Sequence, residues 1–324
     1  MSDIIKSKNP MVSIVIPCFN AEKYIEDSIK SALSQTYDSF EVIVINDGSS
    51  DKSEEIILKF ITEISYRKTV NRGANAARNL GIAISRGEYI QFLDADDILF
   101  PSCLNEKIEF MIQTGKIPVS NYIKIQFDGA VSNIGWEKLS NDSFISMLNS
   151  SPWTAAPIYP KEALLKISGF DENLSCGQEF ELAVRLAINT DIPDNFASLK
   201  IPLAVYRHTP GSISSNGKLS DILIRLFIKW DKELSHANLL TNERKYGLSC
   251  AFANAARWKF RAGHNDDAMD LWKRSKFLSP QGWRSPYPKN VQKFIVWVAG
   301  PIFAETLFKK FRVFVSMTLS IVKL

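Results

Sequence analysis

Residues 89–97 read YIQFLDADD, an apolar run of strand type that ends in three carboxylates within four residues. Buried strands do not normally end in charge unless a ligand neutralises it. Successive side chains of an extended segment point to opposite sides, so Asp94 and Asp96 are expected to project to the same side. One carboxylate can then hold a divalent cation, which takes oxygen ligands, while the other accepts a hydrogen bond from a substrate hydroxyl. The alternative is that these acids only belong to a loop or cap a helix that follows them.

The first third of the chain predicts strands that alternate with helices. The expected strands cover residues 12–17, 40–46, 64–70 and 89–93, and the expected helices begin near residue 20 or cover 54–60 and 74–84. This alternation predicts an α/β fold with a mostly parallel sheet and helices on both faces. Ligands bind beyond the carboxyl ends of such strands, so residues 17–20, Asp47 and residues 94–97 are expected to converge on one edge of the sheet.

Two phosphate-binding motifs are missing from the sequence. No G-x-G-x-x-G follows the first strand, which argues against a dinucleotide cofactor, and no G-x-x-x-x-G-K-[ST] occurs, which excludes a P-loop. An acidic site of this kind is therefore expected to bind a diphosphate through a metal cation.

Four motifs occur in order: VSIVIPCFNAE at 12–22, INDGSSD at 45–51, NRGANAARNLG at 71–81 and GEYIQFLDADD at 87–97. Together they resemble the family 2 glycosyltransferases of the GT-A fold, over roughly residues 11–215. The resemblance implies a GT-A type, Rossmann-like sheet flanked by helices. It also implies a metal-dependent enzyme that transfers a sugar from a nucleotide sugar and inverts the anomeric centre.

The resemblance assigns the base of the nucleotide to one group of residues. Asp47 matches the carboxylate that accepts from the base ring, usually uracil, and Pro17, Asn20 and Glu22 line the same pocket. The competing explanations are that Asn20 and Glu22 cap the first helix, and that Asp47 only forms a turn before Gly48.

A second group is assigned to the rest of the donor. Arg78 matches a basic residue near the nucleotide, Asp94 matches the acid on the ribose or donor-sugar hydroxyls, and Asp96 matches the ligand of Mn²⁺ or Mg²⁺ under the diphosphate. For Arg78 the alternative is a solvated or salt-bridged side chain on a helix surface.

The acceptor side of the resemblance contains two departures from the family pattern. Glu179, in the segment 177–187, stands where the family usually has the Asp that acts as general base on the acceptor hydroxyl. A Glu carboxylate lies one methylene further from the backbone than an Asp carboxylate, so Glu179 can act as the base only if the backbone is set back to compensate. The alternative is that Glu179 and Glu181 only favour a helix N-terminus. Residues 206–214 resemble a Y-R-x-H-x-x-S segment with the histidine one place early. His208 is thus a second candidate for metal or diphosphate, or a partly buried packing residue.

Beyond a polar N-terminal tail at 1–10 and the catalytic domain at 11–215, residues 216–324 predict an all-helical extension. An amphipathic helix is expected at 218–234 and a helix pair at 246–262 and 266–278, in the pattern of a single tetratricopeptide-type hairpin. The apolar runs 294–304 and 311–322 are each shorter than the ~20 residues that span a bilayer. They predict a membrane-surface segment or, alternatively, helices packed on the catalytic domain.

Charge is distributed unevenly along the chain. Residues 1–215 carry 20 basic and 27 acidic side chains, whereas residues 216–324 carry 19 and 8, for a net charge of +4. The basic part favours an anionic neighbour such as a membrane surface, and no nucleic-acid motif is present. The four cysteines form no C-x-x-C pair and the N-terminus lacks an apolar signal segment, so we expect a reduced, cytoplasmic setting, peripheral at the inner face of the membrane.

The sequence therefore predicts an inverting, metal-dependent glycosyltransferase that uses a UDP-linked donor and a glycan or lipid-linked acceptor, in the synthesis of a bacterial surface polysaccharide. Two hypotheses compete with it. One is a non-catalytic binding or scaffold protein with the GT-A fold. The other is a nucleotidyltransferase, against which the missing Gly-rich loop argues.

Overall fold

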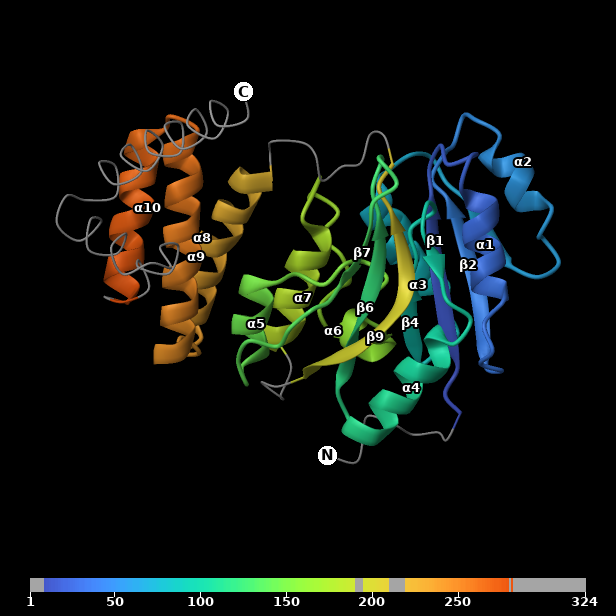
Figure 1. The fold of residues 1–324 in the computed structure, drawn as a ribbon, viewed down its shortest axis with the longest axis horizontal. Coiled ribbons are helices and arrows are strands. Elements are labelled where there is room, and N and C mark those ends of the chain that lie inside the picture. Colours follow the sequence, from blue (N-terminus) through green and yellow to red (C-terminus); the bar gives the residue numbers. More distant parts are fainter. Residues whose placement is uncertain (1–8, 190–194, 210–218, 280, 282–324) are drawn as a thin grey trace, which may run out of the picture. The chain divides into compact units, whose positions relative to one another are not determined.

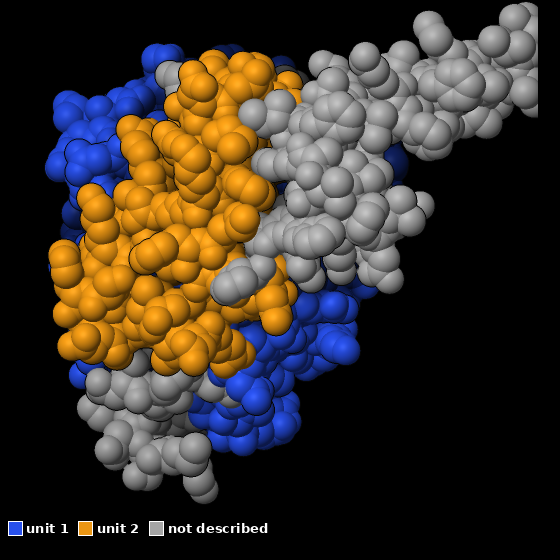
Figure 2. Space-filling view, turned by 90° about the vertical axis from the view of Figure 1, so that its left-hand side faces the viewer, with its two compact units in different colours: residues 1–216 blue, residues 217–324 orange. Residues whose placement is uncertain are grey.

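The computed structural model describes residues 9–189, 195–209, 219–279 and 281 (Figure 1). The chain divides into two compact units, residues 1–216 and residues 217–324, which Figure 2 shows in different colours. Most of the predicted N-terminal tail lies outside the described residues, as do the two apolar runs at 294–304 and 311–322.

The main sheet of the first unit has the strand order β3-β2-β1-β4-β8. Its strands are β1 (Val12–Cys18), β2 (Phe40–Asn46), β3 (Ser65–Lys68), β4 (Tyr89–Phe92) and β8 (Tyr159–Pro160). The first four are parallel, as predicted, and β8 adds an antiparallel edge. The register pairs Cys18 with Asn46 and Val15 with Phe92, so the segments that follow β1, β2 and β4 leave the sheet at the same edge.

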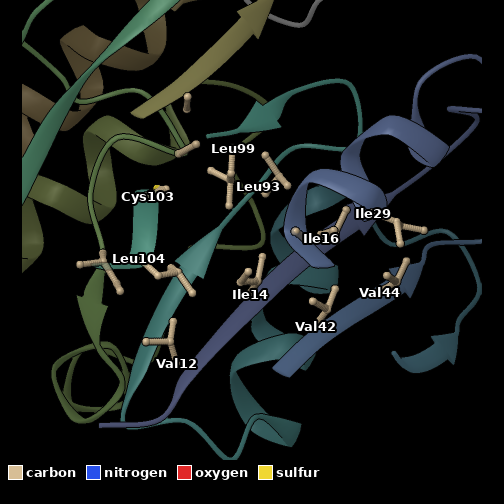
Figure 3. Close-up of a cluster of buried hydrophobic side chains, with 14 of the residues drawn as sticks. Val12, Ile14, Ile16, Ile29, Val42, Val44, Leu93, Leu99, Cys103 and Leu104 are labelled. Carbon is tan, nitrogen blue, oxygen red and sulfur yellow. The ribbon is translucent and has the colours of Figure 1, made fainter. Parts of the chain in front are cut away.

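Helices cover both faces of this sheet because its central strands are apolar on both sides. On one face lie α1 (Ile25–Leu33), α2 (Ser53–Leu58) and α4 (Cys103–Thr114). The labelled core in Figure 3 joins Val12, Ile14 and Ile16 of β1 to Val42 and Val44 of β2, Ile29 of α1 and Leu104 of α4.

The opposite face of the sheet carries α3 (Ala74–Ile84), with α6 (Lys161–Lys166) beside it. A Cβ added to Gly81 of α3 would lie 2.3 Å from Cγ1 of Val15, so only glycine lets this helix approach β1 so closely. The close approach brings the N-terminal half of α3, which includes Arg78, near the end of the sheet where β4 runs into the acidic segment.

A second sheet, which the sequence did not predict, has the order β5-β9-β6-β7. It consists of β5 (Ile98–Leu99), β6 (Ile117–Ile125), β7 (Val131–Ile134) and β9 (Phe196–Arg207). Residues 98–99 pair with β9, and α4 begins only at Cys103, after Ser102. The interpretation of the acidic segment as a cap for the next helix is therefore wrong.

Two further helices complete the first unit: α5 (Ser143–Asn149) and α7 (Gln178–Asn189), which pack together. In α7, Glu181 is 1 % exposed and accepts from Arg185 Nε at 2.6 Å and from Nη2 at 2.7 Å. Arg185 also donates to the carbonyls of Ile167 and Gly169. The ion pair with Glu181 thus holds the Arg185 side chain where it donates to the segment ahead of α7.

The second unit consists, in its described part, of α8 (Leu219–His236), α9 (Asn242–Arg261) and α10 (Asn265–Leu278). Helices α9 and α10 pack against each other across a tight turn at Gly263, where φ is +87°, so the predicted helix pair is confirmed. Trp230 and Phe252 are buried between the helices, and Asp231 accepts from Arg274 at 2.5 Å. None of the helices in the described ranges is both long and apolar enough to cross a membrane.

Candidate active site

The loops that follow β1 and β2 are tied to each other by side-chain to backbone hydrogen bonds. Asn20, which has a left-handed backbone with φ of 49°, accepts from Ser50 N at 2.8 Å through Oδ1. Glu22 accepts from Lys52 N at 3.0 Å. Helix α1 begins at residue 25 without a side-chain cap, so the alternative that Asn20 and Glu22 cap it is wrong. Both residues lie just beyond Pro17, at the edge where the sequence places the base of the nucleotide.

Asp47 is the most heavily hydrogen-bonded acid at this edge and is 2 % exposed. Its Oδ1 accepts from Thr69 Oγ1 and from Arg72 N, both at 3.0 Å, and its Oδ2 accepts from Gly73 N at 2.7 Å. The carboxylate therefore fixes the loop between β3 and α3, which is more than a local turn requires. Each carboxylate oxygen has two lone pairs, so Oδ2 keeps the capacity to accept from a ligand.

Arg78 lies at the centre of the site. It is 4 % exposed, and its Nη2 lies 2.6 Å from Asp94 Oδ1 and 3.4 Å from Glu179 Oε1. The guanidinium also lies over the ring of Phe170, 5.2 Å from its centroid. A buried guanidinium requires paired charge, and the two carboxylates supply it. Arg78 is therefore salt-bridged, as one alternative had it, but it is buried and is not a solvated residue on a helix surface.

Glu179 occupies the first turn of α7 and has a second partner. Thr154 Oγ1, in the loop before β8, donates to Glu179 Oε1 at 3.0 Å. Arg78 and Thr154 thus hold the same oxygen, which orients the carboxylate and leaves Oε2 as the oxygen to accept a proton. A position in the first turn of a helix explains why residue 179 is acidic, but it does not explain the contacts of Glu179 with Arg78 and Thr154.

The other two acids of the segment are held by the end of β9. Thr209 Oγ1 donates to Asp96 Oδ2 at 2.8 Å, and Arg207 N donates to Asp97 Oδ1 at 2.9 Å. The Arg207 side chain donates to the backbone carbonyl of Asp96. Burial and the neighbouring Asp94 raise the pKa of Asp96 above its usual range.

Asp97 is fully buried, and its Oδ2 has no hydrogen-bond partner among the described residues. Burial, Asp94 and Asp96, in that order, raise the pKa of its carboxyl group well above the ordinary value. An unpartnered carboxylate in the interior destabilises the fold, and such features concentrate at functional sites.

This burial predicts how stability depends on pH. In the unfolded chain Asp97 titrates near 3.8, whereas in the folded protein its pKa is higher. Between these values the folded state binds more protons, so the free energy of unfolding falls as the pH rises through that window. At pH 7 in the presence of chelator, we expect Asp97→Asn to be more stable than the wild type by about 1 kcal/mol or more, and the difference to shrink toward pH 4.

Urea unfolding at both pH values measures this difference, with Asp38→Asn as the control because Asp38 is exposed. The control is expected to match the wild type. An Asp97→Asn protein that is less stable than the wild type at pH 7 would contradict the prediction.

Within the described residues, His208 has no hydrogen bond or ion pair with Asp96. Its ring packs 4.3 Å from that of Phe127 and 6.4 Å from that of Tyr206, centroid to centroid. Among the described residues of this segment, Thr209, which stands where the family pattern places histidine, is the one whose side chain donates to the carboxylate of Asp96. Its hydroxyl cannot replace an imidazole as a strong metal ligand, but it orients the carboxylate.

The donor atoms near Asp96 suit a hard cation. They are carboxylate and hydroxyl oxygens, which Mg²⁺ and Mn²⁺ prefer. Within the described residues, no three His, Cys, Asp or Glu side chains gather as a self-sufficient metal site. Because Asp94 is paired with Arg78, a cation here would depend on Asp96 and on phosphate oxygens of a ligand, as Mg²⁺ often does.

Two solved structures resemble this chain over most of its length. TarS residues 1–349 of S. aureus, in complex with UDP-GlcNAc, has a TM-score of 0.56 and 15% identity, covering 84% of this chain and 92% of that one. The mannosyltransferase PcManGT of Pyrobaculum calidifontis, in complex with GDP-Man and Mn²⁺, has a TM-score of 0.54 and 14% identity, covering 88% and 89%. These likenesses show the fold: an α/β fold of the GT-A glycosyltransferase type, followed by helices.

Curated relatives agree with this class. An uncharacterized glycosyltransferase of Rickettsia typhi is 33% identical over 184 residues, which is 54% of this chain and 58% of the relative. The putative glycosyltransferase EpsH of Bacillus subtilis is 32% identical over 169 residues, which is 43% and 49%. The chain thus spans about half the length of these two relatives. The family model for glycosyl transferase family 2 matches residues 13–173, so this part of the chain is a domain of that family.

The sequence indicated some of the residues that build the site and missed others. Thr154 was given no role, because a single hydroxyl in a loop forms no pattern. Arg207 was included in the Y-R-x-H-x-x-S resemblance without a role of its own. Asp97 was included in the acidic segment without a role. Thr209 was visible as the residue in the histidine position, but nothing in the sequence indicated that it would contact Asp96.

Proposed function

We propose that this protein transfers a sugar from a nucleoside diphosphate sugar, UDP-linked, to an acceptor hydroxyl with inversion at the anomeric carbon. The observation that carries the proposal is the position of the buried Arg78, which pairs with the partly exposed carboxylates of Asp94 and Glu179. Asp94 is suited to accept from hydroxyls of the donor, and Glu179 is suited to accept from the acceptor hydroxyl. Both are held by Nη2 of Arg78. Family membership supports the assignment, as does the GT-A fold shared with TarS, whose structure holds UDP-GlcNAc.

The chemistry is a single displacement. Glu179 Oε2 takes the proton of the acceptor hydroxyl as its oxygen bonds to the anomeric carbon, while the bond from that carbon to the diphosphate oxygen breaks. Attack from the face opposite the leaving group inverts the configuration. Thr154 and Arg78 keep the carboxylate in place, which offsets the extra methylene that Glu179 has relative to Asp.

The leaving group is a nucleoside diphosphate, and its negative charge grows as it departs. Asp96, oriented by Thr209, is the residue that would hold Mn²⁺ or Mg²⁺, and the cation supplies the charge that stabilises the diphosphate. Pro17, Asn20, Glu22 and Asp47 surround the place of the base at the edge of the sheet.

The cellular setting is part of the proposal. The basic C-terminal part favours an anionic membrane surface, so we infer a cytoplasmic enzyme that is peripheral at the inner face of the membrane. A glycan or lipid-linked acceptor and a role in surface polysaccharide synthesis are consistent with that setting. Nucleic acid is not expected as a partner.

Calorimetric titration with UDP-, GDP- and dTDP-sugars, each with Mn²⁺ and again with chelator, tests the proposal. We expect one donor class to bind in a metal-dependent manner and its nucleoside diphosphate to be released on incubation. If no nucleotide binds under either condition, the non-catalytic scaffold hypothesis replaces this one.

A further inference from the structure

Five aromatic side chains form a continuous row on the second sheet and the loop beside it; we call it the aromatic strip. Ring centroids are separated by 4.3 Å between Phe127 and His208, 6.4 Å between His208 and Tyr206, 5.5 Å between Tyr206 and Trp153 and 4.7 Å between Trp153 and Tyr122. Tyr122 belongs to β6 and Tyr206 to β9, which lie side by side in Figure 1.

Two members of the aromatic strip, Trp153 and His208, precede residues that hold acids of the candidate active site. Trp153 directly precedes Thr154, whose hydroxyl donates to Glu179. His208 directly precedes Thr209, whose hydroxyl donates to Asp96. The aromatic strip therefore adjoins both the proposed general base and the proposed metal-binding carboxylate.

Packing against the hydrophobic core explains the presence of some of the five aromatic side chains but not of all of them. Tyr122 and Trp153 rest against the main core and are partly buried. Phe127, in the turn between β6 and β7, is 60% exposed, and Tyr206 and His208 are partly exposed. An exposed phenylalanine at a hairpin turn adds little to the core, so its ring is available to a ligand.

The chemistry around the aromatic strip selects the ligand. Ring faces are electronegative and attract C–H groups, while the Tyr206 hydroxyl and the His208 nitrogens offer hydrogen bonds at the ring edges. Lys124 Nζ lies 5.6 Å from the Tyr206 ring, and Arg207, between Tyr206 and His208, is already paired with the Asp96 carbonyl and with Asp27. Glu179 and Asp96 would repel an anionic group. A neutral molecule with apolar C–H faces and many hydroxyls fits this combination, which is the description of a saccharide.

We propose that the aromatic strip binds the saccharide part of the acceptor, and that the acceptor is a glycan; this inference rests on the proposed function. A sugar ring stacked on Trp153 would lie beside Thr154, the residue that donates to Glu179. The turn that carries Phe127 would contact the next residue of the glycan.

Release of nucleoside diphosphate from the donor, with and without neutral saccharides, tests this proposal. The probes are glucose, galactose, N-acetylglucosamine and the disaccharides maltose, cellobiose and chitobiose. In the wild type we expect at least one saccharide to accelerate release. Phe127→Leu keeps an apolar side chain but removes the ring face, and is expected to raise the apparent KM for that saccharide about three- to tenfold. Phe127→Tyr keeps the ring and should retain the wild-type KM.

Phe277→Leu is the matched control, because Phe277 is 88% exposed and lies in the other unit of the chain. It should leave release and its acceleration unchanged. Acceleration by none of the saccharides in a protein that does release nucleotide, or an unchanged KM in Phe127→Leu, would overturn the glycan-acceptor proposal alone. A wild-type protein that binds and turns over no donor would overturn the proposed function as well.

Discussion

Asp96→Asn is expected to lower metal-dependent release of nucleoside diphosphate about a hundred- to a thousandfold, because it removes the carboxylate that would hold the cation under the leaving group. The variant should still fold, since Asn keeps the shape of the side chain and can accept from Thr209 Oγ1 as Asp96 Oδ2 does. Calorimetry should show that Mn²⁺ no longer tightens nucleotide binding.

Two companion variants separate the carboxylate from its surroundings. Thr209→Val removes the hydroxyl that orients Asp96 and is expected to give a smaller loss, about tenfold. Asp38→Asn, at an exposed acid away from the site, should behave as the wild type. Wild-type turnover in Asp96→Asn would show that the diphosphate is stabilised elsewhere.

Glu179→Gln is expected to abolish most of the transfer, by about a hundred- to ten-thousandfold, because an amide cannot take the proton of the acceptor hydroxyl. Nucleotide binding should remain, since the donor contacts that we propose are made by the other carboxylates. Saturation of the enzyme with donor separates the two effects: kcat for transfer falls while the dissociation constant of the nucleotide stays near that of the wild type.

Glu181→Gln, two residues further along α7, is the contrasting variant. It breaks the buried ion pair with Arg185 and is expected to lower the free energy of unfolding by about 3 kcal/mol. Thermal unfolding of both variants distinguishes a chemical role from a structural one. If Glu179→Gln transferred sugar at the wild-type rate, a different base would have to be sought.

Most of the main sheet could be predicted from the sequence, because its strands are local runs of β-branched residues and its helices show a 3.6-residue period. The second sheet could not. Residues 98–99 are too few to show a strand pattern, and they pair with β9 more than a hundred residues later. Such pairing depends on the packing of α4 and β6 rather than on local sequence preference.

The candidate site was predictable where a motif placed acids at the ends of strands, as with Asp94 and Asp96. The burial of Arg78 was not, since it lies on a helix among small and polar residues, and its surroundings come from Phe170 and α7, about a hundred positions away. The contacts of Thr154 and Thr209 likewise depend on how the loops meet in space.

One guanidinium shared by two acids also constrains how this site can change. A substitution at Asp94 removes a partner of Arg78 and thereby changes the charge that faces Glu179, so the effects of changing both acids would not add. If Asp94 and Glu179 have the roles that we propose, donor selectivity and the strength of the base would be inherited as one trait. A descendant with a new donor would then also need an adjusted base.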